Sequence, residues 1–153
     1  KFDIDQPHFL LGCTWMIGTP VPLPLVRDIW FSRGLNPHRE SIRRAIIEFG
    51  VSDWDDIERD ILSGRDRLWI VLDGMEVEMV VTTTLVDDAC EIVACGGRRL
   101  NECLPLLSMI EQYARDSKKR IMRIFGRKGW QRVLKNYAVV GTQGKATVLE
   151  RLL

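Results

Sequence analysis

The sequence lacks several features that would identify a particular class of protein. No apolar run approaches the roughly 18 residues that a membrane-spanning helix needs. The first residues also lack the basic start and apolar centre of a secretion signal. With only two histidines and no Cys-x-x-Cys pair among four cysteines, no metal site is expected. No Ser-His-Asp arrangement is indicated, and no phosphate-binding GxxxxGKS or GxxxxGKT motif occurs. These absences favour a protein of the cell interior with reduced core thiols and no membrane association.

The composition predicts one globular domain with an adequate core. The chain has 153 residues, of which 46% are hydrophobic, so neither metals nor disulfides are needed to stabilise it. Its net charge of +1 excludes a protein that coats a polyanion and an acidic disordered tail.

The charge is nevertheless split along the chain. Residues 1–88 carry 9 basic and 16 acidic side chains, whereas residues 89–153 carry 13 basic and 5 acidic ones. The excess predicts a positive flank that contacts nucleic acid or a protein partner. Its candidate residues are Arg115, Lys118, Lys119, Arg120, Arg127 and Lys128. The alternative is that the acidic half packs against this flank and neutralises it, because no clustered aromatic residues interleave the basic ones as stacking platforms.

The first 24 residues read as an N-terminal extended arm, and residues 25–153 as the main domain. Alternating prolines at 20, 22 and 24 do not suit a helix or a central strand. The arm is also too apolar to be a free tail, so it packs either on its own domain or on a neighbouring subunit. We expect the second arrangement, which would make the arm a site of self-association.

Periodicity predicts the elements of the main domain. Helical spacing follows Pro24, continues over 41–49 and recurs in a short helix that Ser52 caps and Gly64 ends. Extended runs over 68–72 and 77–86 flank an Asp-Gly turn and predict an antiparallel hairpin. A third strand over 90–95 precedes one long helix from Leu100 to Ala114. A strand over 121–125, a helix over 129–136 and two strands over 138–141 and 146–152 complete the chain.

This order of elements resembles the GNAT acetyltransferase fold from about Pro24 to the end of the chain. The fold is α+β, with a mixed, mostly antiparallel sheet flanked by helices. Local stretches are similar to small GNAT-like proteins of tailed phages, including the internal virion protein of short-tailed phages. The stretches that carry this likeness are Leu68-Trp69-Ile70-Val71, Glu91-Ile92-Val93-Ala94-Cys95-Gly96-Gly97-Arg98-Arg99 and Ile124-Phe125-Gly126-Arg127-Lys128-Gly129-Trp130.

The resemblance implies a cofactor turn after the third strand of this domain. GNAT enzymes carry R/Q-x-x-G-x-G/A there, because small residues let backbone amides approach the pyrophosphate of acetyl-CoA. Here Gly96 and Gly97 keep a permissive backbone, but Arg98 replaces a small residue and the initial Arg or Gln is missing. We expect no cofactor. The alternative is that acetyl-CoA binds, with Arg98 and Arg99 replacing amide contacts by charge-assisted hydrogen bonds.

The same resemblance points to two proton-transfer candidates. Glu91 lies on the strand that supplies a base, and Tyr137 lies close to the helix that supplies a tyrosine acid. Leu134 stands where the family tyrosine usually falls. The alternative interpretation makes Glu91 a solvent-facing strand residue and Tyr137 a packing residue with a wet hydroxyl.

These patterns lead to three functional hypotheses. The first is a non-catalytic GNAT-like protein in the virion and the host cytoplasm, which acts in assembly, genome packaging or ejection through other virion proteins or DNA. The second is an acetyl-CoA-dependent N-acyltransferase. The third is a nucleic-acid-binding accessory protein that uses the positive flank.

Overall fold

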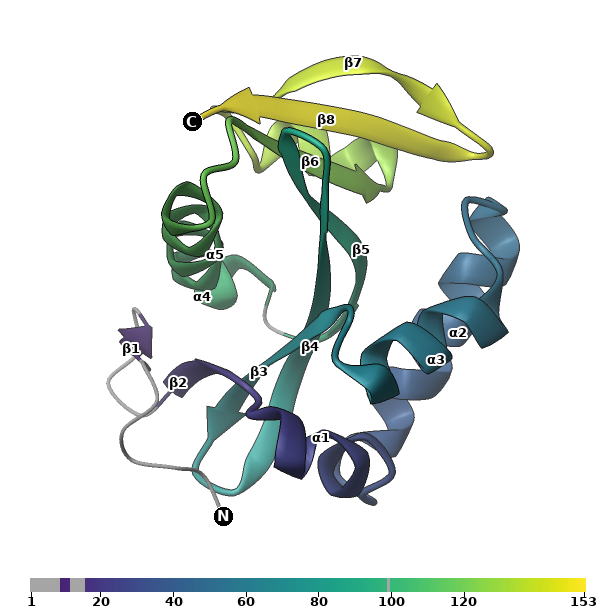
Figure 1. Cartoon of the computed structure of the whole chain (residues 1–153), viewed down its shortest axis with the longest axis vertical. Coiled ribbons are helices and arrows are strands. Elements are labelled where there is room, and N and C mark those ends of the chain that lie inside the picture. Colours follow the sequence, from purple (N-terminus) through teal and green to yellow (C-terminus); the bar gives the residue numbers. More distant parts are fainter. Residues whose placement is uncertain (1–8, 12–15, 99) are drawn as a thin grey trace.

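The computed structural model describes residues 9–11, 16–98 and 100–153 and contains an eight-stranded mixed sheet with helices on both faces (Figure 1). The strands are β1 (Phe9–Leu11), β2 (Met16–Pro20), β3 (Arg67–Asp73), β4 (Glu76–Val86), β5 (Ala89–Gly97), β6 (Ile121–Gly126), β7 (Ala138–Gln143) and β8 (Ala146–Leu152). The helices are α1 (Leu23–Trp30), α2 (Asn36–Phe49), α3 (Trp54–Ser63), α4 (Leu100–Cys103) and α5 (Pro105–Asp116), with a 3-10 helix η1 (Lys128–Arg132).

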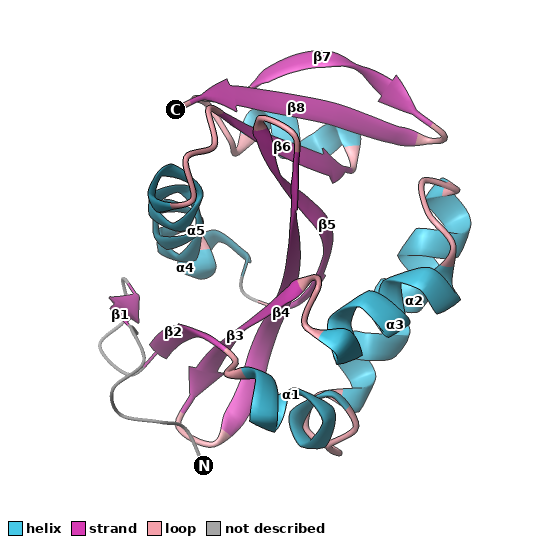
Figure 2. Ribbon diagram, viewed as in Figure 1, coloured by secondary structure: helices cyan, strands magenta, loops and turns pink. Residues whose placement is uncertain are grey.

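The order of strands in the sheet is β1-β2-β3-β4-β5-β6-β8-β7. Among the described strands, β5 and β6 form the one parallel pair, and every other pair is antiparallel. Figure 2 shows α1, α2 and α3 on one side of the sheet and α4 and α5 on the other. The predicted α+β class and mixed sheet are therefore confirmed.

Local sequence explains where α2 and α3 end and where α3 begins. Gly50 and Gly64 end α2 and α3 in the left-handed conformation, which glycine adopts at no steric cost. The N-cap of α3 is Asp53 and not the predicted Ser52, because the Asp53 carboxylate accepts hydrogen bonds from the amides of Asp55 and Asp56. A carboxylate also interacts favourably with the positive end of the helix dipole.

Two apolar clusters hold the helices on the sheet. On the α5 side, Trp69, Ile92 and Ile110 belong to a cluster that extends to β6 and β8. On the other side, Trp30 and Ile61 join the opposite face of β3 and β4. Trp30 and Trp69 are fully buried in these clusters, while Trp54 and Trp130 are half-buried and pack against them.

The described part of the predicted arm differs from the expectation. Met16–Pro20 pair with β3 as strand β2, and the Met16 side chain is fully buried in the protein's own core. β2 pairs with β1 only as far as Gly18. Pro20 lies beyond this stretch, so its missing amide hydrogen removes no hydrogen bond to β1. Residues 1–8 and 12–15 of the arm lie outside the described residues, and self-association through it stays a prediction.

Two further elements differ from the sequence-based prediction. The long helix is divided at Leu104 into α4 and α5, because Pro105 starts a new helix and has no amide hydrogen to continue the old one. The predicted helix over 129–136 is the short 3-10 helix η1, and Val133 and Leu134 both donate backbone hydrogen bonds to the Trp130 carbonyl as it ends.

Candidate functional site

A cleft opens where the parallel strands β5 and β6 separate. The two strands pair from Ala89 with Ile121 to Ile92 with Ile124, and no described strand pairs with β5 on that side beyond Ile92. A cavity of about 250 Å³ occupies this divergence. Its lining comes from α2 and the loop after it, from β4, from the ends of β5 and β6, from η1 and from the start of β8. The lining residues are Ser41, Ile42, Ala45, Ile46, Phe49, Val51, Met79, Val93, Ala94, Cys95, Gly96, Gly97, Arg98, Phe125, Gly126, Arg127, Trp130 and Ala146.

A β-bulge marks the point where β5 leaves β6. Thr82 of β4 pairs with Ala94 and Thr83 pairs with Ile92, so Val93 is one extra residue on β5. Such a bulge bends its strand and increases the local twist. The bend therefore falls next to the last paired residue, Ile92, and directs the rest of β5 away from β6.

The glycine pair forms the tightly packed end of β5. Gly96 pairs with Val80 and Gly97 with Met79. A Cβ atom on Gly96 would lie 2.9 Å from Ile42 Cγ1, and one on Gly97 would lie 2.4 Å from the Glu78 carbonyl oxygen. The glycines are thus required for close packing of β5 against α2 and β4.

The residue after the glycine pair is tied to β4. The Arg98 amide donates to the Glu78 carbonyl oxygen at 2.8 Å, and Arg98 Nε lies 3.4 Å from Glu78 Oε2. The Arg98 amide is therefore already hydrogen-bonded within the protein and does not donate to a ligand. The helix that follows, α4, has only 4 residues, so the turn offers little of the amide nest that the resemblance implies. The fourth candidate in this turn, Arg99, lies outside the described residues.

The candidate base Glu91 is engaged in an ion-paired ladder across three strands. Its side chain is 16% exposed and lies 2.6 Å from Arg123 Nη1, while Arg123 Nε lies 2.6 Å from Glu150 Oε2. The hydrogen bonds that Arg123 donates to Glu91 and Glu150 raise the pKa of its guanidinium. Glu91 is thus not the solvent-facing residue of the alternative interpretation, and it does not line the cavity.

The candidate acid Tyr137 belongs to a buried polar network behind the cavity. Its hydroxyl donates to Glu111 Oε2 at 2.7 Å, and Arg151 Nη1 donates to the same carboxylate at 3.0 Å. Burial and the hydrogen bond to Glu111 raise the pKa of Tyr137. With 8% of its surface exposed, Tyr137 does not have the wet hydroxyl that its packing interpretation predicted, and it lies outside the cavity lining.

A smaller apolar cavity of about 40 Å³ adjoins the cleft on the α5 side. It shares Met79, Cys95 and Trp130 with the first cavity, and Leu134 forms part of its wall. Because Leu134 is buried and apolar, the position where the family tyrosine was expected offers no proton donor.

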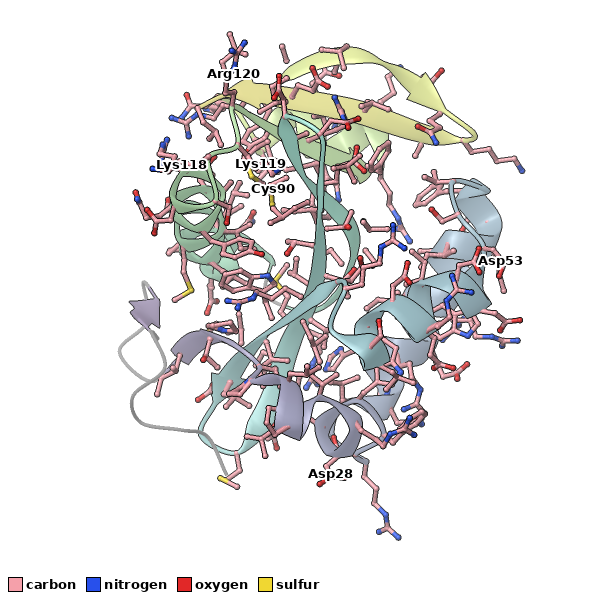
Figure 3. All side chains as sticks on the ribbon, viewed as in Figure 1. Asp28, Asp53, Cys90, Lys118, Lys119 and Arg120 are labelled. Carbon is pink, nitrogen blue, oxygen red and sulfur yellow. The ribbon has the colours of Figure 1, made fainter. Side chains whose placement is uncertain are left out.

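The predicted positive flank is divided between two ends of β6. Lys118, Lys119 and Arg120 lie beside the start of β6, next to the end of α5 (Figure 3). Arg127 and Lys128 follow its last residue, so at about 3.3 Å per residue some 20 Å separates the two groups. Lys119 Nζ also donates to the Asp87 carbonyl oxygen at 2.6 Å.

Other classes of site find no support in the described part of the chain. His38 is buried, and its Nε2 lies 2.7 Å from the Val77 carbonyl oxygen. Residues 9–11, 16–98 and 100–153 contain no group of three or more potential metal ligands. No helix in these ranges is both long and apolar enough to span a bilayer.

Comparisons with solved structures identify the fold. The chain matches the PaiA N-acetyltransferase of Thermoplasma acidophilum in complex with coenzyme A, with a TM-score of 0.61, 12% identity, and coverage of 90% of this chain and 99% of that one. It also matches a GNAT family acetyltransferase from Elizabethkingia anophelis with acetyl-CoA bound, with a TM-score of 0.64, 9% identity, and coverage of 92% and 100%. The match to the GNAT domain of PAT from S. lividans has a TM-score of 0.62 and 14% identity, and it covers 100% of both chains.

These likenesses establish the GNAT acetyltransferase fold for this chain. No family model matches it, and neither does any curated protein. With identities of 14% or less to these three structures, the likeness shows the architecture alone and does not carry their activities over.

Sequence reasoning missed the cavity wall on α2 and the partners of both proton-transfer candidates. One signal was available: Glu111 is a carboxylate at a buried phase of an apolar helical stripe, beside Ile110 and Ala114. A charge in that position indicates a buried partner. The partners themselves, Tyr137 and Arg151, are 26 and 40 residues away in sequence, and no local pattern indicates them.

Proposed function

We propose that this chain binds an acyl-coenzyme A type thioester in the cleft between β5 and β6. The observation that carries the proposal is the unpaired edge of β5 beyond Ile92, which faces a cavity of about 250 Å³. Two of the solved structures with this fold contain coenzyme A or acetyl-CoA, which supports the same ligand class here.

The physical basis is the hydrogen-bonding capacity of a strand edge. Backbone amides and carbonyls of Val93–Gly97 on the side of β6 have no strand partner among the described residues. An extended ligand that carries amide groups can pair with such an edge as an added strand would. The apolar wall from Ile42, Ala45 and Ile46 covers the other side of that ligand and excludes water.

The geometry favours binding without a dedicated pair of proton-transfer groups. Glu91 is ion-paired to Arg123, Tyr137 is hydrogen-bonded to Glu111, and neither lines the cavity. A raised pKa also makes Tyr137 a poorer acid. This supports the non-catalytic interpretation of the scaffold. The cavity supports the alternative interpretation of the sequence, in which acetyl-CoA binds.

The experiment is a calorimetric titration of the protein with acetyl-CoA. We expect saturable binding that is abolished by Ala45→Trp, since this substitution fills the cavity from α2. The matched control is Ile47→Trp, because Ile47 lies on the exposed face of the same helix, is 60% exposed and does not line the cavity. Absence of heat at millimolar acetyl-CoA, or equal loss in both variants, would contradict the proposal.

Acyl transfer to an amine is the second candidate function. The observation that favours it is the shared fold with solved acetyltransferases. In that case the acceptor amine must reach the thioester already deprotonated, because neither proton-transfer candidate lines the cavity. Release of free coenzyme A thiol from acetyl-CoA, measured against a panel of amines, distinguishes transfer from binding. A rate equal to the rate without protein excludes the transferase.

A role in assembly, in a virion or with nucleic acid, is a separate proposal. The observation that favours a protein partner is strand β7, which lies at the sheet edge with all 6 residues exposed, including Val139 and Val140. Unpaired strand edges are templates for pairing with another chain. Sedimentation of the purified chain tests self-association, and recovery of the chain in purified phage particles tests the virion role. A monomer absent from such particles would rule out both.

A further inference from the structure

We propose that Arg127, Lys128 and Arg132 bind the phosphate groups at the nucleotide end of the ligand, in place of an amide nest after β5. This inference rests on the proposed binding of an acyl-coenzyme A type thioester. It assigns the anionic part of that ligand to the β6 and η1 side of the cleft, whereas the resemblance implied the β5 side.

The β5 side is poorly equipped to hold a diphosphate. The amide of Arg98 is occupied by the Glu78 carbonyl oxygen, and Gly97 is paired with Met79 in the sheet. The Arg98 guanidinium also lies beside the Glu78 carboxylate, whose side chain is only 8% exposed. A phosphate on Arg98 would therefore meet a nearby fixed negative charge.

The β6 side presents cations that form no ion pair with a described carboxylate. Arg127, Lys128 and Arg132 are all exposed, and none forms an ion pair with a carboxylate of the described residues. Arg127 lines the cavity itself, and Lys128 and Arg132 line a neighbouring hollow on η1. Arginine is suited to phosphate because its planar group donates two parallel hydrogen bonds.

Trp130 anchors the backbone that carries these cations beside the cleft. Its ring packs on the backbone at the end of β6, where a Cβ atom on Gly126 would lie 3.4 Å from Trp130 Cδ2. The same ring lines both the cleft and the apolar cavity beside it. Because Trp130 is in the middle of η1, the helix and its basic residues are fixed relative to the cleft.

The experiment compares a thioester that carries the phosphorylated nucleotide with one that does not. Acetyl-CoA carries a diphosphate and a phosphorylated adenosine, and acetyl-pantetheine carries the same thioester arm without the phosphates and without the adenosine. We expect the wild-type chain to bind acetyl-CoA at least tenfold more tightly than acetyl-pantetheine. The triple variant R127Q/K128Q/R132Q should lose this preference and keep the wild-type affinity for acetyl-pantetheine. The control variant R115Q/K118Q/R120Q removes the same charge at the other end of β6 and should change neither affinity.

Each outcome has a distinct meaning. If the triple variant keeps the preference for acetyl-CoA, the phosphates bind elsewhere, so the inference fails and the proposed function stands. If the wild-type chain binds neither thioester, both fail. Circular dichroism checks that the triple variant folds. If the triple variant does not fold, the single variants Arg127→Gln and Arg132→Gln are measured in its place. Inorganic pyrophosphate is the third probe: competition with acetyl-CoA only in the wild type supports the assigned cations, and equal competition in the triple variant overturns them.

Discussion

Replacing Gly144 with alanine tests the contact that joins the β7–β8 hairpin to α2 beside the cleft. Gly144 lies in the turn between these strands with φ +58, and a Cβ atom there would lie 2.2 Å from the Phe49 carbonyl oxygen. The next amide, Lys145, donates to the same carbonyl oxygen at 2.8 Å. Because Phe49 and Ala146 both line the cavity, this contact brings two of its walls together.

The expected loss of stability has two parts. A left-handed conformation costs an alanine about 1–2 kcal/mol, and displacing the Phe49 carbonyl sacrifices a backbone hydrogen bond with a net value of about 0.5–1.5 kcal/mol. Gly74→Ala is the matched control, because Gly74 has φ +61 and nothing within 4 Å of an added Cβ atom. We therefore expect Gly144→Ala to lower the free energy of unfolding by about 2–3 kcal/mol, and Gly74→Ala by about 1–2 kcal/mol.

Chemical denaturation of the two variants measures this difference. Hydrogen exchange of the Lys145 amide provides an independent reading, because the amide loses its acceptor only in Gly144→Ala. We also expect weaker binding of acetyl-CoA by Gly144→Ala alone. Equal destabilisation by both substitutions, with unchanged protection of Lys145, would refute the reasoning.

The remaining predictions concern four side chains. Thr82 Oγ1 is buried with no partner in the described protein, so Thr82→Val should raise the free energy of unfolding by about 1 kcal/mol. Thr83→Val should lower the free energy of unfolding by about 1 kcal/mol, because Thr83 Oγ1 accepts a hydrogen bond from Trp69 Nε1 at 3.0 Å. Denaturation midpoints of the two variants that shift in the same direction would contradict this pair of predictions. Burial raises the pKa of Asp66 from 3.8, so its contribution to stability falls as pH rises from 3.8 through the folded-state pKa. Asp66→Asn should therefore stabilise the protein more at pH 7 than at pH 3, and the opposite order in denaturation curves at the two pH values would show that the sign is wrong. Cys95 lines the cleft, so acetyl-CoA should protect it from alkylation in peptide mass spectra; unchanged labelling places the ligand elsewhere.

Elements set by short-range patterns could be predicted from the sequence. The Asp-Gly turn places the β3–β4 hairpin, because glycine supplies the positive φ of 61° at Gly74. Gly50 and Gly64 mark helix ends for the same reason. The parallel strand β6 follows from a helix that connects two strands of one sheet.

The candidate site depended on long-range contacts that no local pattern encodes. Three prolines argued against a strand before residue 25, yet only Pro20 lies within β2, and it pairs opposite Trp69. The chemistry of Glu91 is set by its ion pair with Arg123, a residue 32 positions later that no local pattern links to it. The cofactor turn after β5 was implied by resemblance, whereas the α2 wall of the cleft could be found only from the tertiary structure.

The parallel pairing of β5 with β6 is short, so the sheet consists of two units that are joined by few backbone hydrogen bonds. Four register pairs join β1–β5 to the unit of β6, β8 and β7, with the Glu91–Arg123–Glu150 ladder across the join and the Glu111–Arg151 contact behind it. A force that pulls these two units apart would act on this seam, and a ligand seated between the strands would press against its last register pair, Ile92 with Ile124.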